Sequence, residues 1–285
     1  MENIAADHDL RCSLERFRCV VDILVRKPNS VNKRIVGASI LAVDDLTEPP
    51  DEEPKFEQLL DEFADAPPDT RCLADGVPNV GARIIRRLVP KNITGDKSAI
   101  ELIRWKVEPN KASVTFTPLE KDRQVTFKCA YRVRTNLGTD SGLFLDVDKE
   151  ADPATRQLLA KSVFECVKRW CGEDALTSSP PSMRLVDLEK YQRKYMQLKE
   201  THGKKLIENW TESTDPEKFV HEDVAIAAYL ILLWEEEKEK ATFIDLGCGN
   251  GLLVYILSRE GYTGRGVDIR RRKIWDAYGN GIDLR

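Results

Sequence analysis

The sequence lacks any paired-cysteine pattern, although it contains seven cysteines in 285 residues. An odd number of cysteines without a C-x-x-C pair argues against a disulfide framework and against a structural zinc site. We therefore expect reduced thiols, as in the cytosol or nucleus. The seven are Cys12, Cys19, Cys72, Cys129, Cys166, Cys171 and Cys248.

Long apolar runs and an excess of basic residues are also missing. The longest apolar run, 224–234, is about half of the roughly 20 residues that a membrane-spanning helix needs. Residues 1–7 lack the basic and apolar segments of a signal peptide. Because the formal net charge is -4, any nucleic-acid binding must use a local patch. These absences predict a soluble, cytoplasmic protein with no membrane partner.

The first half of the chain is rich in short β-branched and aromatic segments, which are typical of strands. An acidic, proline-flanked stretch at 44–70 is expected to be a solvated insertion with a short helix at Phe56–Phe63. Residues 1–175 are therefore predicted to form a β-rich (α+β) accessory domain. The expected strands are 19–25, 35–43, 112–116, 124–133 and Gly142–Val147.

Several arginines in this half are candidates for contact with an anionic partner. Arg83, Arg86 and Arg87 lie close together in the sequence. Arg132 and Arg134 alternate with apolar residues, which places both guanidinium groups on one face of a strand. A solvated strand face explains the same pattern, because scattered surface charges are common.

Helical patterns follow from residue 152. Asp152 before Pro153 is typical of a helix start, and apolar residues recur at helical spacing to near Gly172. The stretch 176–183 contains Ser-Ser-Pro-Pro, has linker chemistry and is the predicted domain boundary. A second amphipathic helix is expected from Leu188. A third is expected over 222–240, and its apolar first half should be buried on all sides.

The strongest functional signal is the segment FIDLGCGNG at 243–251, which predicts a buried strand that runs into a glycine loop. Three alternate glycines allow a tight turn and close approach of a ligand, and they are Gly247, Gly249 and Gly251. The helix expected at 252–257 points its N-terminus at that ligand. Dinucleotide sites use G-x-G-x-x-G, whereas this loop is G-x-G-x-G preceded by Asp245. A carboxylate disfavours a pyrophosphate there and favours the cationic S-adenosylmethionine.

A second acid supports this interpretation. The next predicted strand, 265–269, carries Asp268 near its end, where a carboxylate can hold both hydroxyls of a cofactor ribose. Asp245, the glycines and Asp268 together favour a methyl-donor site over a strand-turn-helix without a ligand. Cys248 is interpreted as a small buried thiol, with nothing nearby to lower its pKa.

Four consecutive cations, 270–273, follow Asp268, and Trp275 is beside them. Such a run can neutralise phosphates, and an aromatic ring can stack on a base or a ribose. A solvated helix start is the alternative. Next to a methyl-donor site, the run is interpreted as an RNA-contacting rim.

Three segments together resemble the tRNA (uracil-2′-O-)-methyltransferases, which methylate a ribose of serine tRNA. These segments are KFVHEDVAIAAYL at 218–230, FIDLGCGNGLLV at 243–254 and GRGVDIRRRKIW at 264–275. His221 stands where an aromatic ring is expected, a departure that should affect packing only. The resemblance implies a cytoplasmic enzyme that uses S-adenosylmethionine and acts on tRNA, with a donor pocket lined by Asp245, Gly247, Gly249, Gly251 and Asp268.

The resemblance also implies an α/β fold, in which the accessory domain is followed at 185–285 by the first part of a Rossmann-like class I methyltransferase doubly wound sheet. The groups that orient the target hydroxyl come from later strands of such a fold, so no residue is assigned as catalytic. The chain is thus expected to be C-terminally truncated. The reaction, attack of a ribose 2′-oxygen on the donor methyl carbon, needs no metal.

Two other functions are open at this point. The chain as it stands is a non-catalytic tRNA-binding fragment, in which Arg83, Arg86, Arg87 and the later cations retain the RNA contact. Alternatively, it is part of a methyltransferase of proteins or small molecules, which would share the glycine loop but would not need the cations at 270–273.

Overall fold

The computed structural model describes residues 1–46, 55–69, 73, 76–138, 141–172, 183, 185–237 and 241–285. The chain divides into two compact units, Met1–Leu188 and Glu189–Arg285. The predicted linker at 176–183 lies outside the described residues except for Met183. The limits 1–175 and 185–285, as functional domains, stay a prediction.

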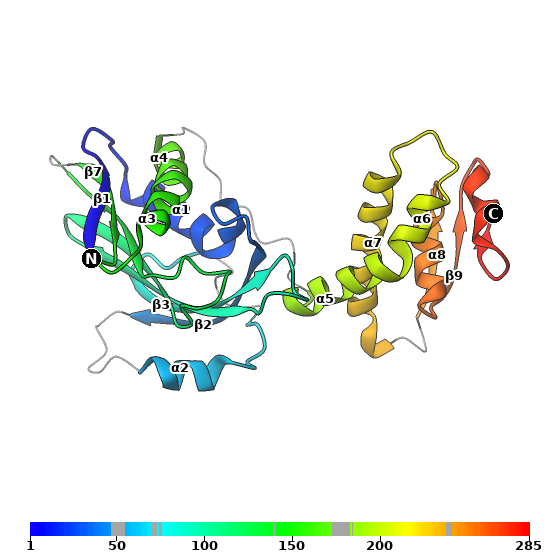
Figure 1. Cartoon of the computed structure of the whole chain (residues 1–285), viewed down its shortest axis with the longest axis horizontal. Coiled ribbons are helices and arrows are strands. Elements are labelled where there is room, and N and C mark those ends of the chain that lie inside the picture. The colour runs from blue at the N-terminus through cyan, green and yellow to red at the C-terminus, as the bar shows by residue number, and fades with distance from the viewer. Residues whose placement is uncertain are drawn as a thin grey trace. The chain divides into compact units, whose positions relative to one another are not determined.

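The first unit contains a seven-stranded antiparallel sheet in the order β1-β7-β6-β5-β4-β3-β2. Strands β2 to β7 pair with their neighbours along the chain, and the N-terminal strand β1 forms the edge of the sheet beside β7 (Figure 1). The strands are β1 Glu2–Asp7, β2 Ile35–Leu46, β3 Gly81–Pro90, β4 Ala99–Glu108, β5 Lys111–Pro118, β6 Tyr131–Asn136 and β7 Gly142–Val147.

The predicted strands at 35–43, 112–116 and Gly142–Val147 are confirmed, while β1, β3 and β4 were not predicted. The expected strand at 124–133 is wrong in its first part, because β6 begins at Tyr131. A turn precedes it, in which Thr126 donates its backbone N–H to the Arg123 carbonyl at 3.2 Å. Lys128 then has a φ of 63°, which no strand residue adopts.

The predicted strand at 19–25 is also wrong, because this segment belongs to helix α1, Leu14–Arg26. Ser13 caps the helix by accepting the Arg16 backbone N–H on its Oγ at 3.1 Å. Buried residues recur every three or four positions, at Phe17, Val20, Val21, Leu24 and Val25. This is the helical period, and the Val- and Ile-rich composition had concealed it.

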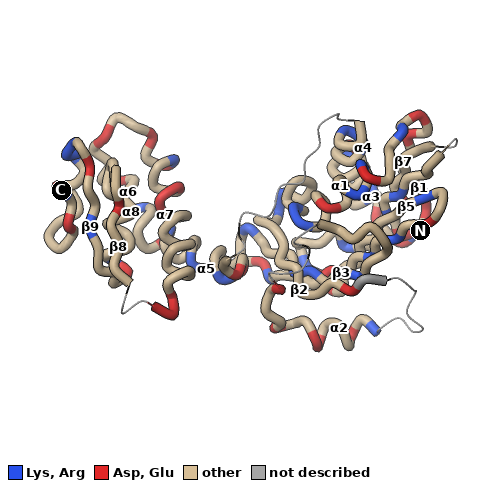
Figure 2. Tube along the Cα trace, turned by 180° about the vertical axis from the view of Figure 1, so that it is seen from behind, with Lys and Arg blue, Asp and Glu red and all other residues tan. Residues whose placement is uncertain are grey.

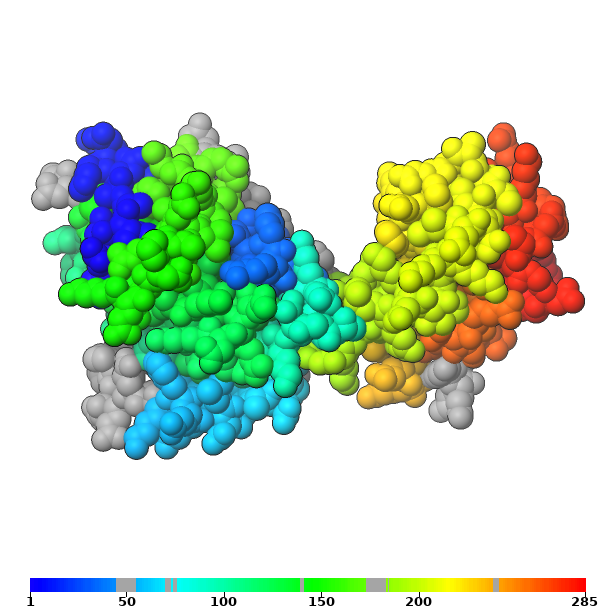
Figure 3. Space-filling model, viewed as in Figure 1, coloured from blue at the N-terminus to red at the C-terminus, as the bar shows by residue number. Residues whose placement is uncertain are grey.

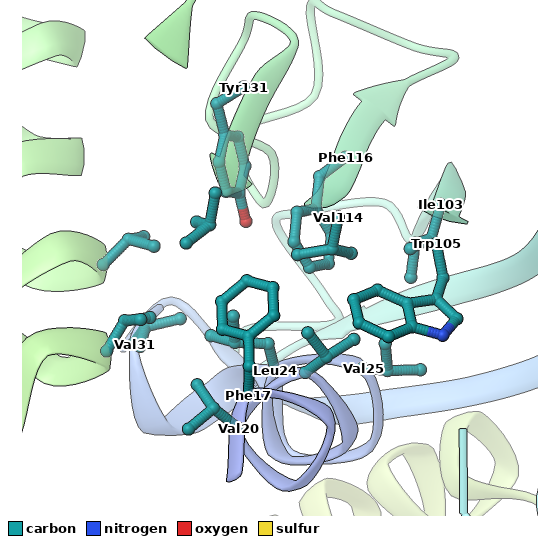
Figure 4. Packing of buried hydrophobic residues seen from close by; sticks show 14 of the residues in the cluster. Phe17, Val20, Leu24, Val25, Val31, Ile103, Trp105, Val114, Phe116 and Tyr131 are labelled. Atoms are coloured by element: carbon teal, nitrogen blue, oxygen red, sulfur yellow. The ribbon is translucent and has the colours of Figure 1, made fainter. Parts of the chain in front are cut away.

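Helix α1 packs on one face of the sheet together with α3, Pro153–Leu159, and α4, Glu165–Gly172, which are joined by a π-helical turn (Figure 1). The predicted start at Asp152 is confirmed, since its carboxylate accepts the Thr155 backbone N–H at 3.0 Å. In the core beneath these helices, Phe17 lies 5.8 Å from Trp105 between ring centroids (Figure 4). Phe116 stacks on Tyr131 at 4.9 Å.

Helix α2, Phe56–Phe63, lies on the opposite face of the sheet, and its predicted bounds are confirmed (Figures 1 and 3). It buries Leu59 in a small apolar cluster with residues of β2, β3 and β4. Arg87 Nη2 donates to the carbonyls of Phe63, Ala64 and Ala66 just after the helix. The rest of the predicted insertion, 47–54 and 70, lies outside the described residues.

A buried arginine of the sheet forms an ion pair within it and also joins it to helix α1. Arg86 on β3 is 2% exposed, and its Nε donates to Glu101 Oε2 on β4 at 2.8 Å. Its Nη1 donates to the carbonyls of Leu24 and Val25 at the end of α1. Arg86 and Arg87 are therefore structural, and the hypothesis that they contact RNA is wrong.

The second unit is a mixed α/β arrangement with a three-stranded parallel sheet in the order β10-β9-β8. The predicted strand that runs into the glycine loop at 243–251, the strand at 265–269 and the helix between them are present, with β8 ending at Leu246 and β9 at Val267. The prediction that the first of these strands is buried is wrong, because alternate residues of β8 are exposed. The elements are α5 Leu188–Leu198, α6 Lys204–Glu208, α7 Pro216–Leu233, β8 Thr242–Leu246, α8 Leu252–Arg259, β9 Thr263–Val267 and β10 Asp283–Leu284.

Helix α7 begins six residues before its predicted start, because Asp215 caps it and Pro216 occupies its first position. Its apolar part is not buried on all sides, since Ile226 is 46% exposed and Leu233 is 41% exposed. No helix among the described residues combines the length and apolar character needed to cross a membrane.

Helices α7 and α8 pack together on one side of the parallel sheet (Figures 1 and 2). The outward row of β8 and β9 is exposed: Ile244 at 56%, Leu246 at 80% and Val267 at 38%. Ile269 beyond β9 is 98% exposed. This face is bare in the described part of the chain, so part of its apolar surface meets water.

Substitution Arg86→Ala should lower the free energy of unfolding of the first unit by about 3–5 kcal/mol, because it leaves Glu101 charged and buried without its partner. The double substitution Arg86→Met/Glu101→Leu should recover part of this loss, but not the two hydrogen bonds to the end of α1. Urea unfolding followed by far-UV circular dichroism measures both. Equal stability of the single and double variants would contradict the explanation.

Substitution Ile244→Glu should reduce aggregation of the 285-residue chain with little change in its melting temperature, because Ile244 is mostly exposed. Light scattering on heating, with Ile256→Glu in the buried core as the contrasting variant, measures the difference. If both variants lowered the melting temperature alike, Ile244 would have to be buried.

Candidate functional site

The glycine loop leaves β8 in a conformation that favours glycine. Gly247, Gly249 and Gly251 have φ angles of 79°, 51° and 73°. No atom lies within 4 Å of the position where a Cβ would be on Gly247 or Gly249. On Gly251 a Cβ would meet Leu284 Cδ1 at 2.9 Å. The first two glycines thus border open space, whereas the third allows close packing.

Backbone hydrogen bonds fix the loop to β9. The N–H groups of Gly247 and Cys248 both donate to the Val267 carbonyl, at 2.8 and 3.2 Å. Within the loop, Gly251 donates its N–H to the Cys248 carbonyl at 2.7 Å. The loop is therefore a tight turn tied to the end of the neighbouring strand.

Asp268 stands where the sequence predicted it, beside the loop. Its Oδ2 accepts the Gly249 N–H at 2.8 Å, and its Oδ1 accepts the Arg270 N–H at 3.0 Å. The hydrogen bond from Arg270 and then that from Gly249 lower the pKa of Asp268. Asp268 is therefore ionised at neutral pH and connects the two strand ends.

Asp245 lies one strand away on β8 and has the opposite perturbation. Burial raises its pKa, and the nearby Asp268 raises it further. The structure thus brings Asp245, the three glycines and Asp268 together at one end of the parallel sheet. Their role in holding a donor stays a prediction.

A third carboxylate, Asp223 on α7, completes the acidic surroundings and was not predicted. Burial, then Asp245 and Glu222, raise its pKa to about 6, against a hydrogen bond with Asn250 of the loop that lowers it. Its only signal in the sequence is its position, just before the apolar run that begins at Val224. The loop is therefore bordered by three carboxylates whose charges influence one another.

Two aromatic residues hold the loop from its other side. Trp275 Nε1 donates to the Gly249 carbonyl at 3.0 Å, and the Tyr278 hydroxyl donates to the Asn250 carbonyl at 2.8 Å. Both lie in a 3₁₀ segment, Lys273–Tyr278, and are buried. The hypothesis that Trp275 stacks on a base or ribose is wrong in this structure, because its ring is 7% exposed.

The cations before this segment are arranged unevenly. Arg270 and Lys273 are exposed, and Arg271 forms an ion pair with Asp276. Arg272 helps to lower the pKa of Asp268, while its buried Nε has no hydrogen-bond partner. Exposed cations therefore border the loop, and their contact with RNA stays a prediction.

Cys248 is 8% exposed, and burial together with Asp245 and Asp268 raises its pKa to about 11. This confirms a thiol with little nucleophilic character. Within the described residues, no group of three or more His, Cys, Asp or Glu is placed to hold a metal ion.

The comparisons with known proteins agree on the region of this loop. A family described as "Predicted AdoMet-dependent methyltransferase" matches residues 185–284. Use of S-adenosylmethionine is therefore implied for this part of the chain. No solved structure matches the chain.

Relatives named "Probable tRNA (uracil-O(2)-)-methyltransferase" match over more of the chain. The protein from Xenopus laevis is 33% identical over 293 residues, covering 92% of this chain and 43% of its own length. That from Mus musculus is 40% identical over 219 residues, covering 69% of this chain and 30% of its own length. The Drosophila melanogaster protein is 30% identical over 267 residues, or 92% of this chain and 47% of its own.

This chain thus spans less than half the length of the curated relatives that it matches. Its similarity to them includes both compact units, because two of the matches cover 92% of the chain. From these matches and the methyltransferase region at 185–284, the chain belongs to the tRNA (uracil-O(2)-)-methyltransferase family.

Proposed function

We propose that the protein containing this chain transfers a methyl group from S-adenosylmethionine to the ribose 2′-oxygen of a uridine in tRNA. The observation that carries the proposal is the loop of open glycines tied by Asp268, within the region that matches the methyltransferase family. The names of the relatives support tRNA as the substrate, and the resemblance found in the sequence supports serine tRNA.

The loop residues fit the adenosine part of such a cofactor. Gly247 and Gly249 have no side chain, and the space beside each is open, so a ligand can approach their backbone. Asp268 uses one acceptor position on each oxygen for backbone N–H groups. An ionised carboxylate has about four such positions, so Asp268 can still accept the two hydroxyls of a ribose.

The surrounding charges fit the other end of the cofactor. S-adenosylmethionine, when bound, supplies an electrophilic methyl carbon on a positively charged sulfur. Asp245 and Asp223 create a negative potential beside the loop, which stabilises a cation there more than in water. We therefore assign Asp245 the role of favouring the cationic donor over a dinucleotide, and Asp223 a supporting role.

In this proposal, residues 185–285 provide the first strands of a Rossmann-like methyltransferase sheet and residues 1–175 form an accessory domain. The β8-α8-β9 connection, with β8 and β9 paired in parallel, supports the first assignment. We place the reaction in the cytoplasm. No described residue is assigned as the general base for the 2′-hydroxyl.

Transfer of a labelled methyl group from S-adenosylmethionine to tRNA tests the activity. The reaction should be run with residues 1–285 and with a chain extended to the length of the relatives. Label at a uridine of tRNA whose 3′ phosphodiester bond resists alkaline hydrolysis would support 2′-O-methylation. Label in protein but not in RNA would end the proposal.

Substitution Asp268→Ala should weaken binding of S-adenosylmethionine at least tenfold, because it removes both the ribose acceptor and the tie to Gly249. The matched control is Asp283→Ala, which removes a partly exposed acid of β10 that pairs with Arg285. Isothermal titration calorimetry measures both. Equal affinity of the two variants would show that Asp268 does not hold the donor.

Substitution Asp223→Asn should weaken donor binding at pH 8 and yet raise stability by roughly 1–3 kcal/mol, because partial burial destabilises the ionised form of this carboxylate. The sign follows from its raised pKa: stability from this group is greatest below its unfolded pKa and falls as pH rises through about 6. Donor affinity of the wild type should change in the opposite sense and fall below pH 6. Thermal melts and calorimetry at pH 5 and 8 test both signs. If the variant kept the wild-type pH dependence of both stability and donor affinity, the assignment would be contradicted.

A further inference from the structure

The outer face of the seven-stranded sheet, which is the face away from α1, α3 and α4, is divided into two halves. Helix α2 covers an apolar half, where Leu59 meets residues of β2, β3 and β4. The other half carries cations at alternate positions of β3, β4 and β6. This cationic half consists of Arg83, Arg104, Lys106, Arg132 and Arg134, with the carboxylates Asp44 and Asp146 at its borders.

The strand register places these cations in rows. Arg83 lies opposite Arg104, which lies opposite Thr115, which lies opposite Arg132. Because neighbouring strands are about 4.8 Å apart, this row crosses four strands over roughly 14 Å. A second row, from Lys106 through Ser113 to Arg134, lies two residues further along the strands.

Packing of the fold does not require this arrangement. Like charges directly opposite each other in a sheet destabilise it, and Arg83 and Arg104 are such a pair. Arg83 is compensated by Asp44, whose Oδ2 accepts its Nε–H at 2.8 Å. At the other border, Arg134 Nε donates to Asp146 Oδ2 at 2.9 Å.

Two cations of this face form no ion pair of their own, although Asp146 lies opposite Arg132 across β6 and β7. Arg132 donates from Nε to the Thr115 hydroxyl at 3.0 Å. Neither Arg132 nor Lys106 forms an ion pair with any carboxylate in the described ranges. Beyond them, Lys111 pairs with Glu108 at 2.9 Å toward the β4–β5 turn. A negative potential supplied from outside would therefore stabilise the middle of this face.

The chemistry of the face fits a phosphate backbone. Among the described residues of this half, five cations stand against two carboxylates in a chain whose formal net charge is -4, and the hydroxyl groups of Ser113 and Thr115 lie between the cations. Figure 2 shows Lys and Arg in blue along the strands of this unit. Phe144 of β7 is 9% exposed and lies under the Arg134 guanidinium, 4.0 Å away, so its ring cannot stack on a base.

We propose that the cationic half of this sheet binds the sugar-phosphate backbone of the RNA substrate. Cations and hydroxyl groups position a nucleic acid without reading its bases, so the contact orients the RNA and does not select its sequence. The cationic surface is inferred from the strands alone, whereas the identification of its ligand as RNA rests on the proposed function. This surface replaces Arg86 and Arg87 as the RNA-contacting residues of this region.

The test is fluorescence anisotropy of labelled tRNA titrated with residues 1–285 at several salt concentrations. The variant Lys106→Glu/Arg132→Glu should bind at least tenfold more weakly, and its salt dependence should fall by about two charges. The matched control is Lys97→Glu/Lys161→Glu, which makes the same change in net charge at exposed residues elsewhere in the unit. The conservative variant Lys106→Arg/Arg132→Lys should retain binding.

A thermal melt detects whether the charge reversal perturbs folding. If it does, the neutral variant Lys106→Gln/Arg132→Gln replaces it in the binding titration. An equal loss in the control pair, or no loss in either, would overturn the proposal. Binding of phosphatidylserine vesicles as tight as that of tRNA would also overturn the proposal, because the surface would then fit a membrane. Binding of S-adenosylmethionine is measured on the same samples and should be unchanged. If the wild type did not bind S-adenosylmethionine, this would contradict the proposed function but not the RNA-binding surface.

Discussion

The hydrogen bond between the Asp268 carboxylate and the Gly249 N–H is the interaction on which the candidate site depends. It joins the end of one parallel strand to the loop that follows the next. A loop with three residues at positive φ has little conformational preference of its own, so its shape must come from its partners. Asp268 supplies one of these partners, and the Val267 carbonyl supplies another.

The same carboxylate fixes the electrostatics of the site. Asp268 is held ionised by backbone N–H groups. Burial raises the pKa of Asp245, and the charge of Asp268 raises it further. Burial likewise raises the pKa of Asp223, and the charge of Asp245 adds to this shift. Folding therefore collects negative charge around an open backbone, an arrangement that suits a cationic ligand and opposes a phosphate.

The predicted parts of the site were those whose residues are close in sequence. The spacing of the glycines and of Asp245 is local, and Asp268 follows from the rule that neighbouring parallel strands end at one edge. Asp223, Trp275 and Tyr278 reach the loop from other elements, and no local pattern marks such contacts.

The first unit shows the same limit in its secondary structure and surface. Helix α2 and the strand Gly142–Val147 were predicted because their patterns are complete within a few residues. Helix α1 was mistaken for a strand because its period shows only when Ser13 and Phe17 are included. The strand partners decide which face an arginine occupies, so Arg86 could not be placed inside the unit from its own neighbours.

The bare apolar row of the second unit has a consequence for the life of the molecule in a cell. Ile244 and Leu246 belong to a strand at the edge of the sheet, whose backbone groups on that side have no strand partner in the described part of the chain. Exposed apolar side chains beside a free strand edge are what chaperones and proteases recognise in incompletely folded proteins. The bare row is therefore the part of this unit where a further strand would pair or a chaperone would bind.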